Sequence, residues 1–196
     1  KPQSVAIVGA SRTSGKVGYE ILSGMLKAGF PGKIFPVNPT ADEIQGLKAY
    51  PDLKSIGQSP DLAVIVVAAK YVPDVIKECV ATGIKAAIIV SSGFKESGNE
   101  GAERERTILH IAKSAGMRII GPNCIGIMVP SSKLNASFGG ELPAAGSIGY
   151  FSQSGSLLAA IVDMARETSL GFIKLISIGN KTDVNELTLI RALGED

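Results

Sequence analysis

The chain has 196 residues, of which 45% are hydrophobic and 19% charged, enough apolar material for the core of one large domain or one and a half. Twenty basic residues against eighteen acidic ones give a net charge of +2, too small to indicate bulk binding of nucleic acid. No run approaches about 18 strongly apolar residues, so no membrane span is expected.

The chain contains two cysteines, Cys79 and Cys124, and a single histidine. The two cysteines form no C-x-x-C pair, and one histidine adds too few ligands. The sequence therefore predicts no metal site. A disulfide between the two cysteines stays open, although nothing indicates a secreted disulfide framework. No signal peptide is recognised before Lys1, although processing could have removed one, and the cytoplasm or a similarly reducing compartment is expected.

Strands and helices alternate from the start of the chain. The strands are short apolar runs, typical of buried parallel strands, and the helices repeat apolar residues at helical spacing. Pro36 indicates an edge or bulge position for the second strand. The pattern predicts an α/β fold with a Rossmann-like, doubly wound parallel sheet. The expected strands are 4–11, 33–39, 61–69, 85–93 and 117–123, and the expected helices are 18–29, 72–83 and 101–116.

Glycine and proline interrupt this pattern after residue 125. We therefore predict a first domain at 1–125, an irregular linker at 126–146 and a partial second domain at 147–196. The second domain looks incomplete because two strands and two helices form a poor domain on their own, so the chain is expected to be a fragment or part of a larger assembly. Its expected elements are strands 147–155 and 172–180 and helices 156–171 and 183–196.

A glycine-rich turn follows the first strand, over residues 9–18, and opens a helix. Backbone N–H groups and the positive end of the helix dipole favour an anion at such a turn. Gly9 begins the turn, and Arg12 and Lys16 add positive charge within it. A phosphate-binding turn is therefore predicted, with a purely structural turn as the alternative.

The turn departs from the pattern of an NAD site. Ala10 and Ser11 stand where the dinucleotide fingerprint G-x-G-x-x-G requires its second glycine. The second strand ends in Asn38 and Pro39 instead of the acidic residue that binds an NAD ribose. No P-loop pattern is present either. A longer, more basic loop favours a ligand with several phosphates.

Polar residues also follow the fourth and fifth strands. Ser91 and Ser92 come after the fourth strand, and Asn123 and Cys124 after the fifth. Because ligands lie beyond the carboxyl ends of a doubly wound sheet, these residues are expected to line one crevice with the first turn. Cys124 has no base nearby in the sequence and is not interpreted as a nucleophile, whereas Asn123 is the better candidate for a polar contact.

Several stretches together resemble one family. They read VAIVGAS…GKVGYEIL, GKIFPVNP, DLAVIVV, VSSGFKE, GPNCIGI and GSIGYFSQSGSLLAAIVD…GF…ISIGNKTDVNE. In this order, and over essentially the whole chain, they are similar to the CoA-ligase part of NDP-forming acyl-CoA synthetases. ADP-forming acetate–CoA ligase is the most similar type, and the succinyl-CoA synthetase α subunit is a more distant one. The resemblance implies a Rossmann-like CoA-binding domain followed by the start of a flavodoxin-like α/β domain.

The resemblance also implies site residues. Asn38 and Pro39 would flank the adenosine end of CoA, and Cys124 would line the place where the CoA thiol end meets a later phosphate-binding turn. Ser154 in that turn also suits a helix N-cap. Relatives often have a lysine just after the Asn-Pro pair, where Thr40 stands here. The implied CoA contacts are Ser11, Arg12, Thr13, Ser14, Val90, Ser91 and Ser92, and the implied phosphate contacts are Gln153, Ser154 and Gly155.

The family forms an acyl phosphate from acyl-CoA and phosphate and passes the phosphoryl group through a histidine to ADP or GDP. The resemblance thus implies CoA and phosphate as ligands, with ADP or ATP and Mg held by other domains. It also implies an ATP-grasp domain or β subunit as partner, within an oligomer. The family's histidine lies later than Asp196, and His110 is expected to be a partly exposed helix residue. The chain alone should therefore not complete the reaction.

Two alternatives remain open at this point. The first is a non-catalytic CoA-sensing domain, such as the related domain at the front of some protein acetyltransferases. The second is an NAD-binding oxidoreductase, which the missing fingerprint disfavours.

Overall fold

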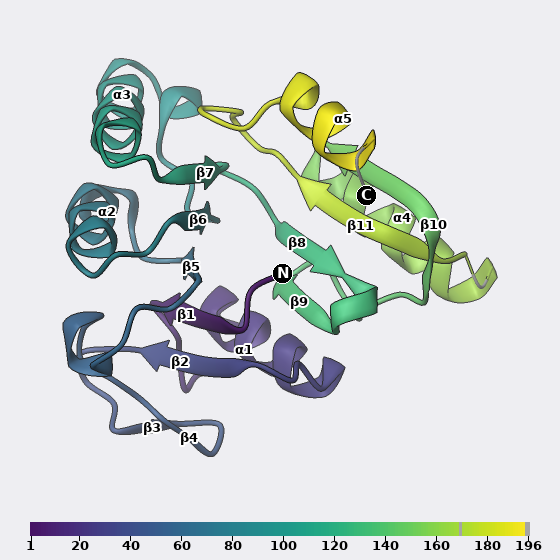
Figure 1. Cartoon of the computed structure of the whole chain (residues 1–196), viewed down its shortest axis with the longest axis horizontal. Coiled ribbons are helices and arrows are strands. Elements are labelled where there is room, and N and C mark those ends of the chain that lie inside the picture. The colour runs from purple at the N-terminus through teal and green to yellow at the C-terminus, as the bar shows by residue number, and fades with distance from the viewer. Residues whose placement is uncertain (169, 195–196) are drawn as a thin grey trace.

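Two β-sheets form the centre of the computed structural model, which describes residues 1–168 and 170–194 (Figure 1). The five-stranded sheet and its helices comprise β1 (Ser4–Val8), α1 (Val17–Ala28), β2 (Lys33–Val37), β5 (Leu62–Ile65), α2 (Val72–Ala81), β6 (Ala86–Ile89), α3 (Asn99–Ser114) and β7 (Arg118–Ile120). The four-stranded sheet and its helices comprise β8 (Gly126–Val129), β9 (Leu134–Ser137), β10 (Ala145–Ser152), α4 (Gly155–Thr168), β11 (Phe172–Ser177) and α5 (Glu186–Gly194). A small hairpin of β3 (Glu43–Ile44) and β4 (Leu47–Lys48) follows β2.

The five strands of the first sheet are parallel and lie in the order β2-β1-β5-β6-β7. The predicted doubly wound sheet is confirmed. Strand β2, which contains Pro36, lies at an edge, where the missing N–H of proline is tolerated. The strand order reverses between β1 and β5, and a doubly wound sheet opens a ligand crevice at such a switch point.

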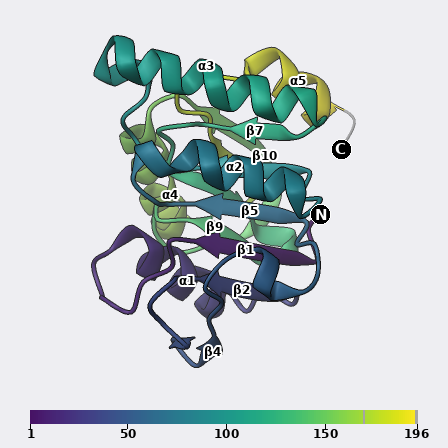
Figure 2. The same ribbon diagram turned by 90° about the vertical axis from the view of Figure 1, so that its left-hand side faces the viewer.

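Side chains of the first sheet alternate between two cores. In β1, Ala6 and Val8 pack with α2 and α3, whereas Val5 and Ile7 pack with α1. The alternation follows from the two-residue period of a strand, and both faces are apolar because both are covered. Helices α2 and α3 lie side by side over one face (Figure 2).

Helix α1 places the first turn of the site. Ile21, Leu22 and Met25 recur at helical spacing and are all buried. Gly29 ends the helix in the left-handed conformation at φ 69°. At its other end, no side chain caps the first N–H groups. Gly18 is buried there, and a Cβ on it would lie 2.1 Å from the carbonyl oxygen of Gly9.

The predicted irregular structure of residues 126–146 is wrong. Strands β8 and β9 form an antiparallel hairpin in this segment, and β8 also pairs with β11, so the second sheet has the order β10-β11-β8-β9. Gly126 is required in the hairpin, because a Cβ on it would lie 2.1 Å from the carbonyl oxygen of Ala136. The division into two domains stays a prediction.

The second sheet is covered by α4 on one face and meets α5 on the other. Leu175 of β11 packs with Leu158 and Val162 of α4, whereas the next residue, Ile176, packs with Leu189 of α5. The hairpin also packs against the first unit, because Val129, Leu134 and Ala136 share a core with α1. The two sheets therefore lie against each other through the hairpin (Figure 1).

In the part of the chain that the structure describes, no helix combines the length and apolar character that crossing a membrane would need.

Replacing Gly18 with alanine should lower the free energy of unfolding by about 2 kcal/mol, because the methyl group would push α1 away from the turn after β1. The matched control is Gly194→Ala in α5, where a Cβ meets no atom within 4 Å and alanine favours the helix. Urea unfolding of both variants tests this difference, and equal stability of the two would contradict it.

Candidate functional site

The carboxyl ends of β5, β6 and β7 open on one cavity of about 560 Å³. It lies next to the switch point between β1 and β5, where a ligand crevice is expected. Seven predicted site residues line it, namely Val90, Ser91, Ser92, Asn123, Cys124, Gln153 and Gly155. The rest of the wall is largely apolar and was not among the predicted site residues; it is formed by Val17, Val66, Val67, Ala68, Ile125, Phe138 and Ser156.

The other predicted residues lie outside the cavity wall. Asn38 and Pro39 follow β2, Ser154 precedes α4, and the rest are on the turn before α1, namely Gly9, Ser11, Arg12, Thr13, Ser14 and Lys16. The side chains of Arg12, Thr13, Ser14 and Lys16 are exposed there. The neighbouring strand end is tied to the same turn, because the side-chain amide of Asn38 donates a hydrogen bond of 2.8 Å to the carbonyl oxygen of Ala10. The guanidinium of Arg12 lies 3.5 Å from the carbonyl oxygen of Thr40, just beyond Pro39.

The turn before α1 is suited to an anion. Gly9 takes φ 95° at the end of β1, which brings the chain round toward the helix. The helix start has no side-chain cap, so the backbone N–H groups and helix dipole are directed toward the turn, where Arg12 and Lys16 add positive charge. Several donors of the turn are used within the chain. Gly15 N–H donates to the carboxylate of Glu20 at 2.9 Å, Thr13 N–H to the hydroxyl of Ser11 at 3.0 Å, and Lys16 N–H to the carbonyl oxygen of Thr13 at 3.3 Å.

The segment after β6 is held in place by hydrogen bonds across the sheet. The Ser91 hydroxyl donates to the carbonyl oxygen of Val67 at 2.5 Å, and the Ser91 carbonyl accepts from Asn123 N–H at 2.9 Å. The hydroxyl of Ser91 is thus occupied in tying strand ends together. Ser92 is exposed beside it, and Val90 is buried.

Cys124 lies in a tight turn after β7. The residue is 5% exposed, and its thiol donates to the carbonyl oxygen of Ile89 at 3.3 Å. Burial raises the pKa of this thiol to about 12, so it stays protonated near neutral pH and is a poor nucleophile. The preceding Asn123 takes the left-handed φ of 57° and lines the cavity.

The turn between β10 and α4 brings a second helix N-terminus to the cavity. Ser154 caps the helix, because its hydroxyl accepts a hydrogen bond of 3.3 Å from Leu157 N–H. Gly155 begins the helix against Ile125, so closely that a Cβ on Gly155 would lie 2.7 Å from that side chain. The N-terminus of α4 therefore lies directly beside the turn that holds Asn123 and Cys124.

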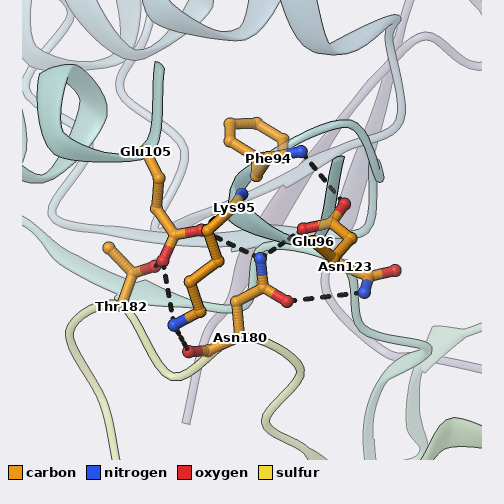
Figure 3. A network of polar contacts seen from close by, with 7 residues as sticks. All are labelled: Phe94, Lys95, Glu96, Glu105, Asn123, Asn180 and Thr182. Atoms are coloured by element: carbon orange, nitrogen blue, oxygen red, sulfur yellow. Dashed lines mark hydrogen bonds and ion pairs between the residues drawn. The ribbon is translucent and has the colours of Figure 1, made fainter. Parts of the chain in front are cut away.

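A polar network connects the two units behind this turn (Figure 3). Glu105 of α3, 6% exposed, accepts hydrogen bonds from Asn180 and Thr182 and forms an ion pair of 3.2 Å with Lys95. Asn180 also donates to Glu96 at 2.6 Å and faces the Asn123 amide at 3.4 Å.

No motif in the sequence indicated this network. Asn180 and Thr182 lie in the stretch ISIGNKTDVNE, which contributed to the family resemblance. Their contacts with Glu105 span 75 and 77 residues, so no local pattern could have paired them.

Two residues considered in the sequence have no place in the cavity wall. His110 is exposed on α3. Cys79 is fully buried among core residues of α2, and burial raises the pKa of its thiol to about 12. Both cysteines are free thiols.

The fold and the cavity define a doubly wound α/β protein in which two helix N-termini, of α1 and α4, approach one crevice. The chain belongs to the family described as "CoA binding domain", which matches residues 3–130. A second family, described as "Succinyl-CoA ligase like flavodoxin domain", matches residues 145–196. The family resemblance seen in the sequence is thereby confirmed.

The chain is similar to named ligases. It is 47% identical to "Acetate--CoA ligase [ADP-forming]" of Methanocaldococcus jannaschii, over 100% of this chain and 27% of that protein. It is 42% identical to "Acetate--CoA ligase [ADP-forming] II subunit alpha" of Pyrococcus furiosus, over 99% of this chain and 42% of that protein. The chain thus spans well under half the length of these relatives.

Solved structures share the fold over the whole chain. The "dinucleotide forming Acetyl-coenzyme A synthetase 1" of Ca. Korarchaeum cryptofilum, in its apo form, matches with a TM-score of 0.96 and 39% identity, over 100% of this chain and 42% of that one. The same enzyme "in complex with phosphate and ADP" also gives 0.96. A protein of Pyrococcus horikoshii OT3 matches with 0.95 and 42% identity, over 100% of this chain and 44% of that one.

Neither thiol should react with iodoacetamide in the native protein at mildly alkaline pH, because both are buried and have a pKa of about 12. Both should be alkylated in urea, where burial is lost. Mass spectrometry of the treated protein measures the extent of reaction. Fast native labelling of Cys124 would contradict its assignment as an unreactive cavity residue.

Glu96 should stabilise the fold above about pH 4.5 and lose this effect in acid. Burial opposes its ionisation, but hydrogen bonds from Asn180 and from the N–H groups of Phe94 and Gly93 outweigh burial and lower the pKa below 4.5. The stabilisation is therefore fully present above the unfolded pKa and disappears as pH falls through the folded pKa. Urea unfolding of the protein and Glu96→Gln at neutral and acid pH should show a stability difference only at neutral pH.

Proposed function

We propose that this chain is the CoA-binding portion of an ADP-forming acyl-CoA synthetase of the acetate–CoA ligase type. The observation that carries the proposal is the cavity itself, where the turn of Asn123 and Cys124 meets the N-terminus of α4 beside Gln153 and Gly155. A thioester and an inorganic phosphate would have to meet in such a place. The names of the relatives support this reading.

In this proposal the phosphates of CoA bind at the turn before α1. The uncapped helix N-terminus supplies N–H groups, and Ser11, Thr13 and Ser14 supply hydroxyls. Arg12 is the principal positive partner, and its proximity to Thr40 places its charge near the site where relatives often carry a lysine. Asn38 and Pro39 flank the adenosine end, since Asn38 is bonded to the same turn.

The pantetheine arm then enters the cavity along Val90, Ser91 and Ser92. Its apolar segment suits the valine-rich wall, and its thiol end reaches Asn123 and Cys124. Cys124 contributes shape there rather than a thiolate, because its pKa is about 12.

Phosphate binds at the N-terminus of α4 in the same proposal. Ser154 is used as the cap, so the backbone N–H groups of Gly155 and Ser156 and the side chain of Gln153 are the proposed donors. A phosphate oxygen bound there would attack the thioester carbonyl, and CoA would leave as the thiolate, with acyl phosphate as the product. Transfer to ADP would use a histidine and an ATP-grasp domain or β subunit that binds ADP or ATP with Mg.

A multi-subunit enzyme is part of the proposal, because relatives carry the name "subunit alpha". A reducing compartment such as the cytoplasm also belongs to it, and the two free thiols are compatible with that setting.

Calorimetry of the protein with CoA and with NAD tests the proposal. CoA should bind and NAD should not, because the turn lacks the dinucleotide fingerprint. Binding of NAD without CoA would overturn the proposal in favour of a redox protein.

Replacing Arg12 with alanine should raise the Kd for CoA about tenfold, because a charge-assisted bond to phosphate is lost. The loss should be larger at low salt, where such contacts are screened less. The matched control is Arg106→Ala, since Arg106 is a surface arginine of α3 paired with Glu103 and lies outside the cavity wall. Unchanged affinity of Arg12→Ala would remove Arg12 from the site.

A further inference from the structure

A buried carboxylate joins the two units of the structure. Glu105 lies on α3 and is 6% exposed, and a charge in such a place is costly unless it is paired and hydrogen-bonded. Both of its oxygens are used. One accepts from Asn180 at 2.9 Å and from Lys95 N–H at 3.2 Å, and the other accepts from Thr182 and pairs with the Lys95 ammonium at 3.2 Å.

Glu105 thereby holds the loop between β11 and α5, and this loop binds the back of the Cys124 turn. Asn180 N–H donates to the carbonyl oxygen of Pro122 at 2.8 Å, and Thr182 N–H donates to that of Gly121 at 3.2 Å. The side-chain amides of Asn123 and Asn180 face each other at 3.4 Å (Figure 3).

The start of the same loop binds the second turn of the cavity. Ile178 N–H donates to the carbonyl oxygen of Ser152 at 2.9 Å, directly before the α4 turn. Ser177 accepts from Ile125 N–H at 3.0 Å. A single segment, residues 177–182, therefore contacts both turns that meet at the cavity.

The contact between this segment and the Cys124 turn is close. A Cβ on Gly179 would lie 2.2 Å from the carbonyl oxygen of Pro122 and 2.5 Å from that of Asn123. Gly179 also takes the left-handed φ of 53°. Small shifts of the segment would therefore move Asn123, whose own φ of 57° is uncommon outside glycine.

We propose that Glu105 and Asn180 are positioning residues that set the placement of Asn123 and Cys124 relative to the N-terminus of α4. The inference rests on the proposed function, because it assumes that the thiol end of CoA lies in this cavity. Glu105 does not contact the turn of Asn123 and Cys124 but holds the loop that binds this turn. Asn180 contacts the side-chain amide of Asn123 directly. Neither belongs to the cavity wall.

The two ends of CoA should then respond differently to the network. In the proposed function the nucleotide end is held by the turn before α1, which follows β1, whereas Glu105 and Asn180 contact the segment after β6 and the turn after β7. The thiol end depends on the two turns that the loop holds together. Disturbing the network should weaken the contribution of the pantetheine arm and leave the contribution of the nucleotide end intact.

Calorimetry with two ligands, CoA and adenosine 3′,5′-bisphosphate, separates these contributions. Asn180→Ala should raise the Kd for CoA about tenfold and leave the Kd for the bisphosphate unchanged. Glu105→Gln preserves the shape of the side chain but loses the charge that pairs with Lys95. It should therefore also raise the Kd for CoA, by a smaller factor than Asn180→Ala. It also serves as the second variant if Asn180→Ala does not fold.

Asp183→Asn is the matched control. Asp183 directly follows the segment 177–182. It accepts from Arg118 at 2.8 Å and from Ile119 N–H at 2.9 Å, at the opposite end of β7 from the turn. It should lower the unfolding midpoint while leaving both Kd values unchanged.

The outcomes separate the inference from the proposed function. Selective loss of CoA affinity in the network variants supports the inference. Unchanged CoA affinity, or equal weakening of both ligands, overturns it even though CoA binds the unaltered protein. Failure of the unaltered protein to bind CoA overturns the proposed function, and the inference with it.

Discussion

The hydrogen bonds between the loop after β11 and the turn after β7 are the contact on which the cavity depends. Asn180 N–H binds the carbonyl oxygen of Pro122, and Gly179 permits the close approach that this bond requires. This contact adds to the packing of the hairpin against α1 and to the bonds of Asp183 with Arg118 and Ile119, which also join the two units. The contact brings the two helix N-termini to one crevice. The proposed CoA site and the proposed phosphate site meet there.

Charge is distributed in the molecule in a way that suits this arrangement. The positive side chains Arg12 and Lys16 are exposed at the outer turn, where phosphates can keep part of their hydration. The cavity contains no charged wall residue among those that line it, so a neutral arm meets a largely apolar surface. Among the described residues, the buried charged side chain is that of Glu105, which lies behind the cavity and is paired with Lys95.

Secondary structure was predictable wherever the residues of one element showed a local pattern, such as an apolar run or helical periodicity. The apolar runs of β1, β5 and β6 are buried on both faces, and α1 has its periodicity and its Gly29 stop within twelve residues. The hairpin of β8 and β9 was not predictable in the same way. Its strands are short, Gly126 resembles a chain breaker, and the pairing partner β11 begins only at Phe172. Antiparallel pairing to a distant strand leaves no local pattern.

The sequence by itself determined the chemical character of the site. Glycine-rich turns before two helices, with Arg12 in the first and Ser154 in the second, indicate anion binding because helix N-termini carry unpaired N–H groups. Only the tertiary structure decided that these turns share a cavity and that Glu105 and Asn180 hold it. Those contacts join residues up to 85 positions apart, and a hydrogen bond between distant residues depends on how whole sheets pack, which no short stretch of sequence encodes.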